Sequence, residues 1–441
     1  MDDFRIESLG PCTIPSPLLA YHDRDGDSLA FVSDGERMLA RNDLEWVQAA
    51  TAAGQPLPSV ELGGPRRHIY FDPAKIGIGI VTCGGLCPGL NNVIRAIVMA
   101  AEHHYGVRRI YGFRYGFRGL VEPSLTTPLT AESVSEIHTA GGTVLGSSRG
   151  PQSTAAMVDR LAALDVQALF IVGGDGSMRG ALDIAAEVRR RGLDIAIIGV
   201  PKTIDNDLRW MDRSFGFQTA YAKAVEAIEG AHREAQGAPN GIGLVKVMGR
   251  HSGFIACAAT VASGNVNFTL VPEVPFTLDG RDGLLETLRR RLELRHHAVI
   301  VVAEGAGQHL FEGPSGVRDA SGNLKLQDIG WLLTDRIKRH FAASNTEINL
   351  KYIDPSYIIR SVPANPADAV FCAMLGMNAV HAAMCGKTEM MIGSWRHTLV
   401  HVPIRLAIAE RNHVDPTGTL WLSVLGSTGQ SLAFQDLPST Q

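Results

Sequence analysis

Two short motifs carry most of the chemistry that this sequence indicates. The first, GGDGS, places Asp175 among glycines, and the second, PKTIDND, places Asp205 and Asp207 beside Lys202. Glycines let backbone N–H groups approach an anion closely, and a carboxylate among them suits Mg²⁺. A carboxylate that takes a proton from a hydroxyl, next to a cation that holds phosphate, is what phosphoryl transfer requires.

Both motifs follow apolar segments that are typical of buried strands. Residues 168–172 and 195–200 are short, apolar and rich in branched side chains. Residues 178–191 between them have helical periodicity, and Ser177 is placed to cap that helix. The sequence therefore predicts a strand–helix–strand unit with a motif at the carboxyl end of each strand, which is the edge where open parallel sheets bind ligands.

Each motif alone has a simpler explanation. A lone GGDG is often a tight strand-to-helix turn, and a lone DND is usually an exposed loop. Both motifs at equivalent ends of neighbouring strands are much harder to explain as turns. The pair favours a site for phosphate and metal.

Other glycine-rich loops follow expected strands in the same way. TCGGLCPGLNN follows residues 76–81 and leads into an expected helix, so it is a second candidate anion site. GGTVLGSSRG ends with Arg149 and Gly150, and the guanidinium of Arg149 could hold a phosphate, although a single loop arginine is more often a solvated charge. MGRHSG follows the expected strand 241–247, and EGAG follows the expected strand 297–303.

Composition excludes several classes of function. With 441 residues, 45% hydrophobic and 20% charged, the chain suits two or three globular domains. A net charge of −4 gives no indication of nucleic-acid or membrane partners. Six scattered cysteines complete no zinc site, so we expect reduced thiols. No apolar run reaches the length of a membrane span, and the acidic start is unlike a signal peptide, so we expect a cytoplasmic protein.

GGDGS, PKTIDND, MGRHSGFIA and AEGAG, in this order and spacing, together resemble the 6-phosphofructokinases. The resemblance covers roughly residues 75 to 400. KYIDPSYIIRSVPAN, the loop GFRYGFRG and the N-terminal extension resemble the branch that lies close to pyrophosphate-dependent enzymes, rather than the short bacterial allosteric type.

The recurring strand, glycine-rich loop and helix favour an α/β fold of two doubly wound, Rossmann-like lobes with the active site in the cleft between them. With the resemblance, the expected parts are an N-terminal extension, a nucleotide-binding lobe in two segments, a sugar-phosphate-binding lobe and a C-terminal tail packed on the core. Their boundaries are 1–72, 73–213 with about 361–400, 214–360 and 401–441. In the extension we expect a strand at 29–32 and a helix at 43–53, capped by Asn42 or Asp43.

The resemblance also implies which residues hold each substrate. Those that line the phosphates of ATP are Gly84, Gly85, Arg149, Gly150, Gly174, Asp175, Gly176 and Ser177. Those that hold fructose 6-phosphate are Thr203, Ile204, Asp205, Met248, Gly249, Arg250, Glu304, Tyr357 and Arg360. The implied cofactor is Mg²⁺, with Asp175 as its ligand.

Catalytic roles are implied for Asp205, Asp207, Lys202 and Arg250. Asp205 accepts the proton of the 1-hydroxyl of fructose 6-phosphate, and Asp207 supports it. Lys202 and Arg250, together with Mg²⁺, position and neutralise the γ-phosphoryl group during transfer.

The donor depends on Gly176 and Lys202. In pyrophosphate users of the family the position of Gly176 is Asp, whose side chain and charge would occupy the space of a nucleotide α-phosphate. Glycine leaves that space open, and it avoids like-charge repulsion in a partly dry site. Lys202 is found in pyrophosphate users, whereas the short ATP-using type has glycine there. We expect ATP as the donor, with pyrophosphate as the alternative.

Rival functions and the oligomeric state stay open at this point. NAD kinases and lipid kinases share a GGDG loop, but they do not account for PKTIDND, MGR and PSYIIR together. Intact Asp175, Asp205 and Arg250 argue against a non-catalytic regulatory subunit. We expect a homo-oligomer, dimer or tetramer. In the short bacterial type an arginine near the position of Gly241 reaches across a subunit interface, and this strand has none.

Overall fold

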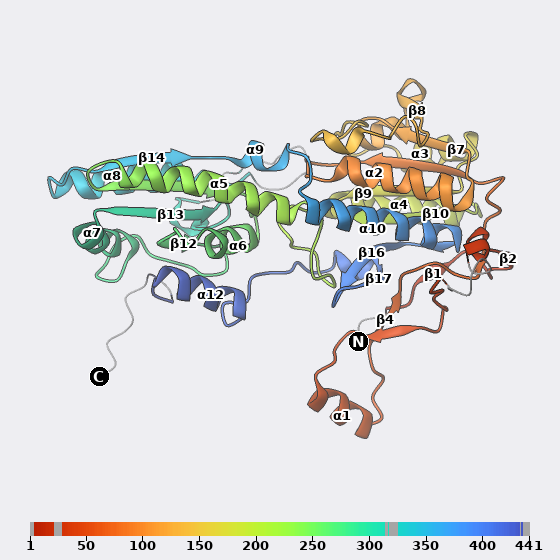
Figure 1. The fold of residues 1–441 in the computed structure, drawn as a ribbon, viewed down its shortest axis with the longest axis horizontal. Coiled ribbons are helices and arrows are strands. Elements are labelled where there is room, and N and C mark those ends of the chain that lie inside the picture. The colour runs from red at the N-terminus through yellow and green to blue at the C-terminus, as the bar shows by residue number, and fades with distance from the viewer. Residues whose placement is uncertain (1–3, 22–28, 314–315, 317–324, 433, 435–441) are drawn as a thin grey trace. The chain divides into compact units, whose positions relative to one another are not determined.

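The computed structural model describes residues 4–21, 29–313, 316, 325–432 and 434. The chain folds as two compact units (Figure 1). Unit 1 comprises residues 1–203, 208–216 and 362–411, and unit 2 comprises residues 204–207, 217–361 and 412–441. Residues beyond 400, which the sequence suggests as one tail, divide between the two units.

Unit 1 is built on a large sheet with a parallel centre. Among the described residues, the strand order is β3-β4-β17-β16-β10-β9-β6-β7-β8. Strands β16, β10, β9, β6 and β7 run parallel, and the outer pairs are antiparallel. The bounds are β3 Arg37–Leu39, β4 Ser59–Leu62, β17 Thr398–Pro403, β16 Met390–Trp395, β10 Ala196–Pro201, β9 Ala168–Gly173, β6 Gly77–Thr82, β7 Arg109–Phe113 and β8 Thr126–Pro128.

Helices cover both faces of this sheet. Helices α3 and α4 pack with β9 and β10 in one apolar core, and α2 and α10 lie side by side (Figure 1). Every residue of β6, β9 and β10 is buried, which explains their continuous apolar sequences. The bounds are α2 Leu90–Met99, which continues as a π-helical turn at Ala100–His104, α3 Thr154–Ala163, α4 Asp175–Arg190 and α10 Pro366–Met384.

Unit 2 repeats the architecture with a smaller sheet. Its described strands have the order β12-β13-β11-β14 and are all parallel. Helices α7 and α8 pack with the sheet in one apolar core, while α5 and α6 pack together. The bounds are β12 Phe268–Leu270, β13 His297–Ala303, β11 Gly241–Val247, β14 Asn349–Ile353, α5 Phe217–Gln236, α6 Phe254–Ser263, α7 Leu284–Arg295, α8 Ile329–Ala343, α9 Ser356–Arg360 and α12 Thr419–Thr428. Both units are doubly wound α/β structures, as predicted.

The N-terminal extension contributes strands to unit 1. β4 pairs antiparallel with β17 and so widens the large sheet. Two short pairs join it elsewhere, β1 (Glu7–Ser8) with β15 (Lys387–Thr388), and β2 (Ile14–Pro15) with β5 (His68–Ile69). The predicted helix is confirmed as α1 (Leu44–Ala52), whose N-cap Asp43 accepts a hydrogen bond from the N–H of Trp46.

The strand predicted at residues 29–32 is wrong. Those residues have no strand pairing, and the strand of this region is β3. The N–H of Val32 donates to the carbonyl of Pro65 at 2.9 Å. Because proline has no N–H to return the bond, a regular ladder cannot continue there.

Within the part of the chain that the structure describes, one helix has the length and composition of a membrane span. α10 is long and apolar enough, by length and composition alone, to cross a bilayer, contrary to the expectation from sequence. However, 67% of its most apolar window is buried inside the structure. It packs on α2 and β10 as a core helix of unit 1.

Candidate active site

The motif GGDGS forms a compressed turn between β9 and α4 in unit 1. A Cβ on Gly173 would lie only 2.3 Å from the Cβ of Ser177, so no side chain fits at that position. Gly174 is the N-cap residue of α4, and Asp175 is the first residue of the helix. The turn therefore places the positive end of the helix dipole and an acidic side chain together.

The structure corrects the predicted role of Ser177. Because α4 begins at Asp175, Ser177 lies in the first helical turn and does not cap the helix. Its N–H donates to the carbonyl of Gly174 at 2.9 Å, and only 8% of the residue is exposed. Because the N-cap residue is a glycine, no polar capping side chain in the sequence marks the start of α4.

Gly176 lies beside open space. Apart from its two chain neighbours and the backbone of its own helix, no atom lies within 4 Å of the position that a Cβ would occupy. A larger side chain at this position would therefore meet solvent or a ligand rather than the protein.

Lys202 links the carboxyl ends of three neighbouring strands. Its N–H donates to the carbonyl of Gly173 at 3.0 Å, and its ammonium Nζ donates to the carbonyl of Gly85 at 2.8 Å. Gly84 has a φ of +85°, and a Cβ there would lie 3.4 Å from this Nζ. The cation is thus held against the glycine-rich loop that follows β6. Only 7% of Lys202 is exposed.

The loop that carries Arg149 and Gly150 interlocks with the same glycines. The hydroxyl of Ser147 donates to the carbonyl of Gly84 at 2.5 Å, and the N–H of Gly84 donates to the carbonyl of Ser148 at 3.4 Å. Arg149 and Gly150 follow directly and are exposed. Unit 1 therefore brings the predicted nucleotide-binding residues together on three adjoining loops.

Asp175 has a cationic partner that sequence reasoning missed. Its carboxylate Oδ2 lies 2.7 Å from a guanidinium nitrogen of Arg411. Arg411 follows α11 (Ile404–Ala407), and its backbone forms an isolated antiparallel β-bridge with Leu208. No motif surrounds this arginine, so nothing in the sequence marks it as part of a site. A metal ion at this carboxylate would have to compete with the guanidinium of Arg411.

The carboxylate of Asp175 fits Mg²⁺ as a single protein ligand. Among the described residues, no group of three or more His, Cys, Asp or Glu side chains could hold a metal ion. Mg²⁺ often takes only one or two carboxylates and completes its shell with water and substrate phosphates. The residues present therefore suit a metal that arrives with a nucleotide.

The boundary between the units crosses PKTIDND, and the second group of predicted residues lies in unit 2. Lys202 and Thr203 belong to unit 1, whereas Ile204, Asp205 and Asp207 belong to unit 2. The remaining predicted residues of unit 2 are Met248, Gly249, Arg250, Glu304, Tyr357 and Arg360.

Asp205 is held by the loop that follows β11. The N–H of Arg250 donates to its carboxylate Oδ2 at 3.4 Å, and the hydroxyl of Ser252 donates to its backbone carbonyl at 2.9 Å. Asp207 is buried, with 5% exposed, and its carbonyl accepts a hydrogen bond from the N–H of Asn412 at 2.8 Å. The structure therefore joins PKTIDND to MGR, and Ser252 is a further supporting residue.

The loops MGR and AEG interlock through their backbones. The N–H of Gly305 donates to the carbonyl of Gly249 at 3.0 Å, and the N–H of Glu304 donates to the carbonyl of Val247 at 2.9 Å. A Cβ on Gly305 would lie 2.0 Å from the carbonyl oxygen of Arg250. This close approach places Glu304 next to the MGR loop.

Glu304 is a half-buried carboxyl influenced by three cations and one carboxylate. Burial raises the pKa of Glu304 above its usual value, and the positive charges of Lys246, Arg250 and Arg360 partly offset that rise. A carboxyl held this way can accept hydrogen bonds from hydroxyl groups when it is ionised.

Tyr357 and Arg360 lie on α9. The guanidinium of Arg360 lies 4.7 Å from the centre of the Tyr357 ring, which is a cation–π arrangement. Tyr357 is 74% exposed, whereas Arg360 is half-buried. A guanidinium and a phenol can hold a phosphate and a hydroxyl.

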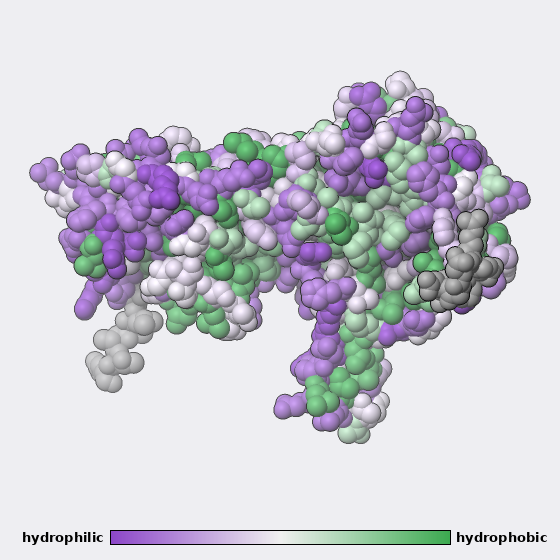
Figure 2. Space-filling view, viewed as in Figure 1, coloured by the Kyte–Doolittle hydropathy of each residue, from purple (hydrophilic) through white to green (hydrophobic). Residues whose placement is uncertain are grey.

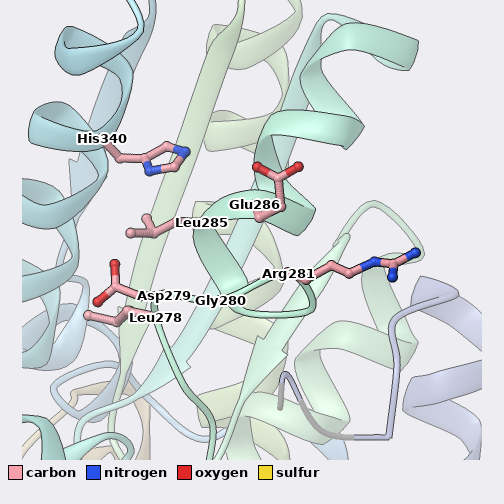
Figure 3. A pocket seen from close by; sticks show the side chains of 7 residues that line it. All are labelled: Leu278, Asp279, Gly280, Arg281, Leu285, Glu286 and His340. Atoms are coloured by element: carbon pink, nitrogen blue, oxygen red, sulfur yellow. The ribbon is translucent and has the colours of Figure 1, made fainter. Parts of the chain in front are cut away.

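Unit 2 also contains a hollow of about 320 Å³ that is separate from the predicted site residues (Figure 3). It is lined by Leu278, Asp279, Gly280, Arg281, Leu285, Glu286 and His340. None of the predicted site residues lines it, and its carboxylates already pair with arginines, Asp279 with Arg336 and Glu286 with Arg289.

Comparison with known proteins identifies the family. A family model described as phosphofructokinase matches residues 77–383. A protein named ATP-dependent 6-phosphofructokinase from Amycolatopsis methanolica is 49% identical, over 98% of this chain and 96% of that protein. A protein of the same name from Borreliella burgdorferi is 47% identical, over 98% of each.

Solved structures share the fold at much lower identity. A pyrophosphate-dependent phosphofructokinase from Nitrosospira multiformis has a TM-score of 0.67 at 20% identity, over 83% of this chain and 95% of that one. Pichia pastoris phosphofructokinase has a TM-score of 0.63 at 21% identity, over 80% of this chain and 37% of that longer one. With the family model and the relatives of nearly equal length, these findings show that the chain belongs to the phosphofructokinase family.

Proposed function

We propose that this chain is an ATP-dependent 6-phosphofructokinase, which transfers the γ-phosphoryl group of ATP to the 1-oxygen of fructose 6-phosphate. Relatives of nearly full length at 47% and 49% identity carry that name. The observation in the structure that best supports the proposal is the position of Lys202, which directly follows β10. Its ammonium Nζ donates a hydrogen bond to the carbonyl of Gly85 at 2.8 Å. It presents a fixed cation among glycine-rich loops, where a transferring phosphoryl group needs one.

Asp205 is the proposed general base. Its carboxylate would accept the proton of the 1-hydroxyl as the new O–P bond forms and the bond to the ATP β-phosphate oxygen breaks. The bonds from Arg250 and Ser252 hold this residue in place. A general base is effective only when its geometry is fixed in this way.

Binding and charge neutralisation are assigned to the remaining residues. The loops around Gly84, Gly150 and Gly174 would contact the ATP phosphates through their backbones. Glu304 would accept hydrogen bonds from sugar hydroxyls, and Arg360 would pair with the 6-phosphate. Lys202 and Arg250 would oppose the charge of the transferring group.

Mg²⁺ is the proposed cofactor, with Asp175 as its protein ligand. When bound, the ion would supply positive charge that offsets the negative charge of the donor phosphates. The chain's own contribution is the placement of one carboxylate at the N-terminus of α4, beside the loops that approach the phosphates. Arg411 shares that carboxylate and must adjust when a metal binds.

Pyrophosphate is the second candidate donor. Lys202 favours it by resemblance, whereas Gly176 favours ATP. The open space beside Gly176 suits the additional phosphate of a nucleotide. We therefore assign ATP as the donor and pyrophosphate as the alternative to be tested.

We further propose a homo-oligomer that works in the cytoplasm. Apolar side chains are exposed on α10 at Val370 (61%) and Met374 (40%), and on α1 at Leu44 (69%). In Figure 1 α1 lies at the end of an arm of unit 1, and Figure 2 shows hydrophobic residues along that arm. Such surfaces are typical of interfaces. The described cysteines are all free thiols, which suits a reducing compartment.

The interface arginine of the short bacterial type, expected near the position of Gly241, has no counterpart on β11. A Cβ on Gly241 would lie 2.1 Å from the carbonyl oxygen of Ala235, so no side chain fits at that residue.

Light scattering after size-exclusion chromatography would measure the oligomeric state. A monomer at micromolar concentration would contradict the oligomer.

A coupled assay for fructose 1,6-bisphosphate tests the proposed activity. Purified protein and fructose 6-phosphate would be given MgATP or magnesium pyrophosphate in separate reactions. We expect turnover with MgATP. Turnover only with pyrophosphate would select the second candidate, and no turnover with either donor would favour a regulatory subunit.

A further inference from the structure

Lys246 is a buried lysine next to the proposed sugar-phosphate site. It lies on β11, two residues before Met248, and only 9% of the residue is exposed. A lysine ammonium is costly to bury unless it is paired and hydrogen-bonded. The position therefore calls for an explanation beyond strand packing, because an apolar residue would stabilise this strand equally well.

Two carboxylates hold the Lys246 ammonium. Its Nζ lies 2.9 Å from Oδ2 of Asp328 and 3.0 Å from Oδ2 of Asp354. Burial alone would lower the pKa of Lys246, but its hydrogen bonds to Asp328 and Asp354 outweigh this effect and raise it. Lys246 is therefore a permanent cation inside unit 2.

The two carboxylates each fix the start of a helix. Asp354 accepts hydrogen bonds from the N–H and the hydroxyl of Ser356, the first residue of α9. Asp328 is the N-cap of α8 and accepts bonds from the N–H groups of Gly330 and Trp331. Lys246 thus ties β11 to the start of both helices.

Of these two helices, α9 carries the proposed ligands Tyr357 and Arg360. It is only five residues long, so its own backbone bonds give it little stability. Its entry follows β14, which pairs in parallel with β11. The bond from Lys246 to Asp354 is therefore well placed to set the position of α9.

Lys246 also acts on Glu304 through its charge. The charged groups that influence Glu304 are Lys246 on β11, Arg250 after it, Asp354 before α9 and Arg360 on α9. Of these, Lys246 is the strongest in opposing the effect of burial on the pKa of Glu304. Loss of the cation would raise the pKa of Glu304 further, so the carboxyl would stay protonated to a higher pH.

We propose that Lys246 is a positioning residue for fructose 6-phosphate, which holds α9, with its Tyr357 and Arg360, through Asp354. The proposal rests on the proposed function, since it concerns the acceptor of that reaction. Lys246 need not touch the substrate to act in this way. Loss of Lys246 should therefore raise the KM for fructose 6-phosphate and leave the KM for ATP nearly unchanged.

The test compares Lys246→Met and Lys246→Arg with the control Lys223→Met. Methionine keeps the length of the side chain without its charge. Lys223 lies on α5 in the same unit and pairs only with the exposed Glu226 among the described ion pairs. Steady-state kinetics would be measured for both substrates across a pH series, together with the melting temperature of each variant.

We expect Lys246→Met to raise the KM for fructose 6-phosphate by roughly 10- to 100-fold, because small displacements of binding groups have effects of that size. The KM for ATP should change by less than about twofold, within the usual scatter of independent sites. The acidic limb of kcat/KM for the sugar phosphate should move to higher pH. Lys246→Arg should restore much of the loss.

Asp354→Asn provides a second variant should Lys246→Met fail to fold. It should raise the same KM, and the double variant should show less than the product of the single effects, because both break one contact. A lower melting temperature with unchanged KM values and an unchanged acidic limb would reduce Lys246 to a structural residue and overturn the proposal. No turnover by the unaltered protein would instead overturn the proposed function itself.

Discussion

In unit 1 the predicted donor residues are mostly glycines and loop backbone, whereas in unit 2 the predicted acceptor residues are mostly charged side chains. Gly173 tolerates no Cβ, and Gly84 needs a positive φ. By contrast, the proposed roles of Asp205, Arg250 and Glu304 depend on their charges, and hydrogen bonds hold the loops that carry Asp205 and Arg250. ATP phosphates can be bound by any well-placed N–H group, but a sugar hydroxyl must meet a particular acid or base.

This difference has a consequence for substitutions. Changes in unit 1 should act by filling space or adding charge where backbone must approach phosphate. Changes in unit 2 should act by removing a charge or a proton acceptor. The substitutions Asp205→Ser, Gly176→Asp and Arg411→Met test that division.

The largest effect should come from Asp205→Ser. Loss of the base should lower kcat by about 10²- to 10⁴-fold, with little change in the KM for fructose 6-phosphate. Steady-state kinetics would measure both. Asp335→Ser is a control, since that exposed carboxylate on α8 pairs with Arg339. An unchanged kcat would remove Asp205 from its role.

Gly176→Asp should have the next largest effect. The added charge would repel the ATP phosphates, and we expect the KM for ATP to rise by roughly 10- to 100-fold. The KM for fructose 6-phosphate should stay nearly constant. Gly176→Ala is the matched control, because open space surrounds this position and a methyl group brings no charge.

Equal changes in both KM values of Gly176→Asp would break the division between donor and acceptor residues. A large effect of Gly176→Ala would show that space, not charge, decides the donor. Melting temperatures should stay close to that of the unaltered protein for both variants, since the side chains meet no protein atoms.

Arg411→Met should have the smallest effect. Asp175 and Arg411 are partly exposed, with side chains 21% and 35% exposed, so their ion pair is worth at most about 1 kcal/mol. Loss of the competing cation should lower the Mg²⁺ concentration for half-maximal activity by about two- to fivefold. Arg209→Met is the control, because Arg209 pairs instead with the neighbouring Glu410. A rise in that concentration would mean that Arg411 contacts the nucleotide rather than competing with the metal.

The parallel strands could be predicted closely from the sequence. The strands predicted at 241–247 and 297–303 match β11 and β13. Such strands are buried on both faces, so they form short apolar runs that end sharply at glycine-rich loops. The motifs at the ends of these strands identified the candidate residues. Their division between the two units could be seen only in the structure, because the boundary between the units lies within PKTIDND.

Other features could not be predicted, for reasons that differ. The start of α4 is capped by glycine, so no polar residue marks it. Lys246 occupies a strand position and gains its meaning only from Asp328 and Asp354, which lie far away in sequence. Arg411 lies in a segment without a motif. Long-range charge pairs leave no local pattern in a single sequence.

The most direct test of the central claim is to follow phosphorus by NMR in one reaction of the purified protein with MgATP and fructose 6-phosphate. We predict that the ATP γ-phosphate signal falls as signals of ADP and of a second phosphomonoester on the sugar grow together, and only when the sugar is present. An intact γ-phosphate signal, or its conversion to inorganic phosphate without a new sugar phosphate, would contradict the account.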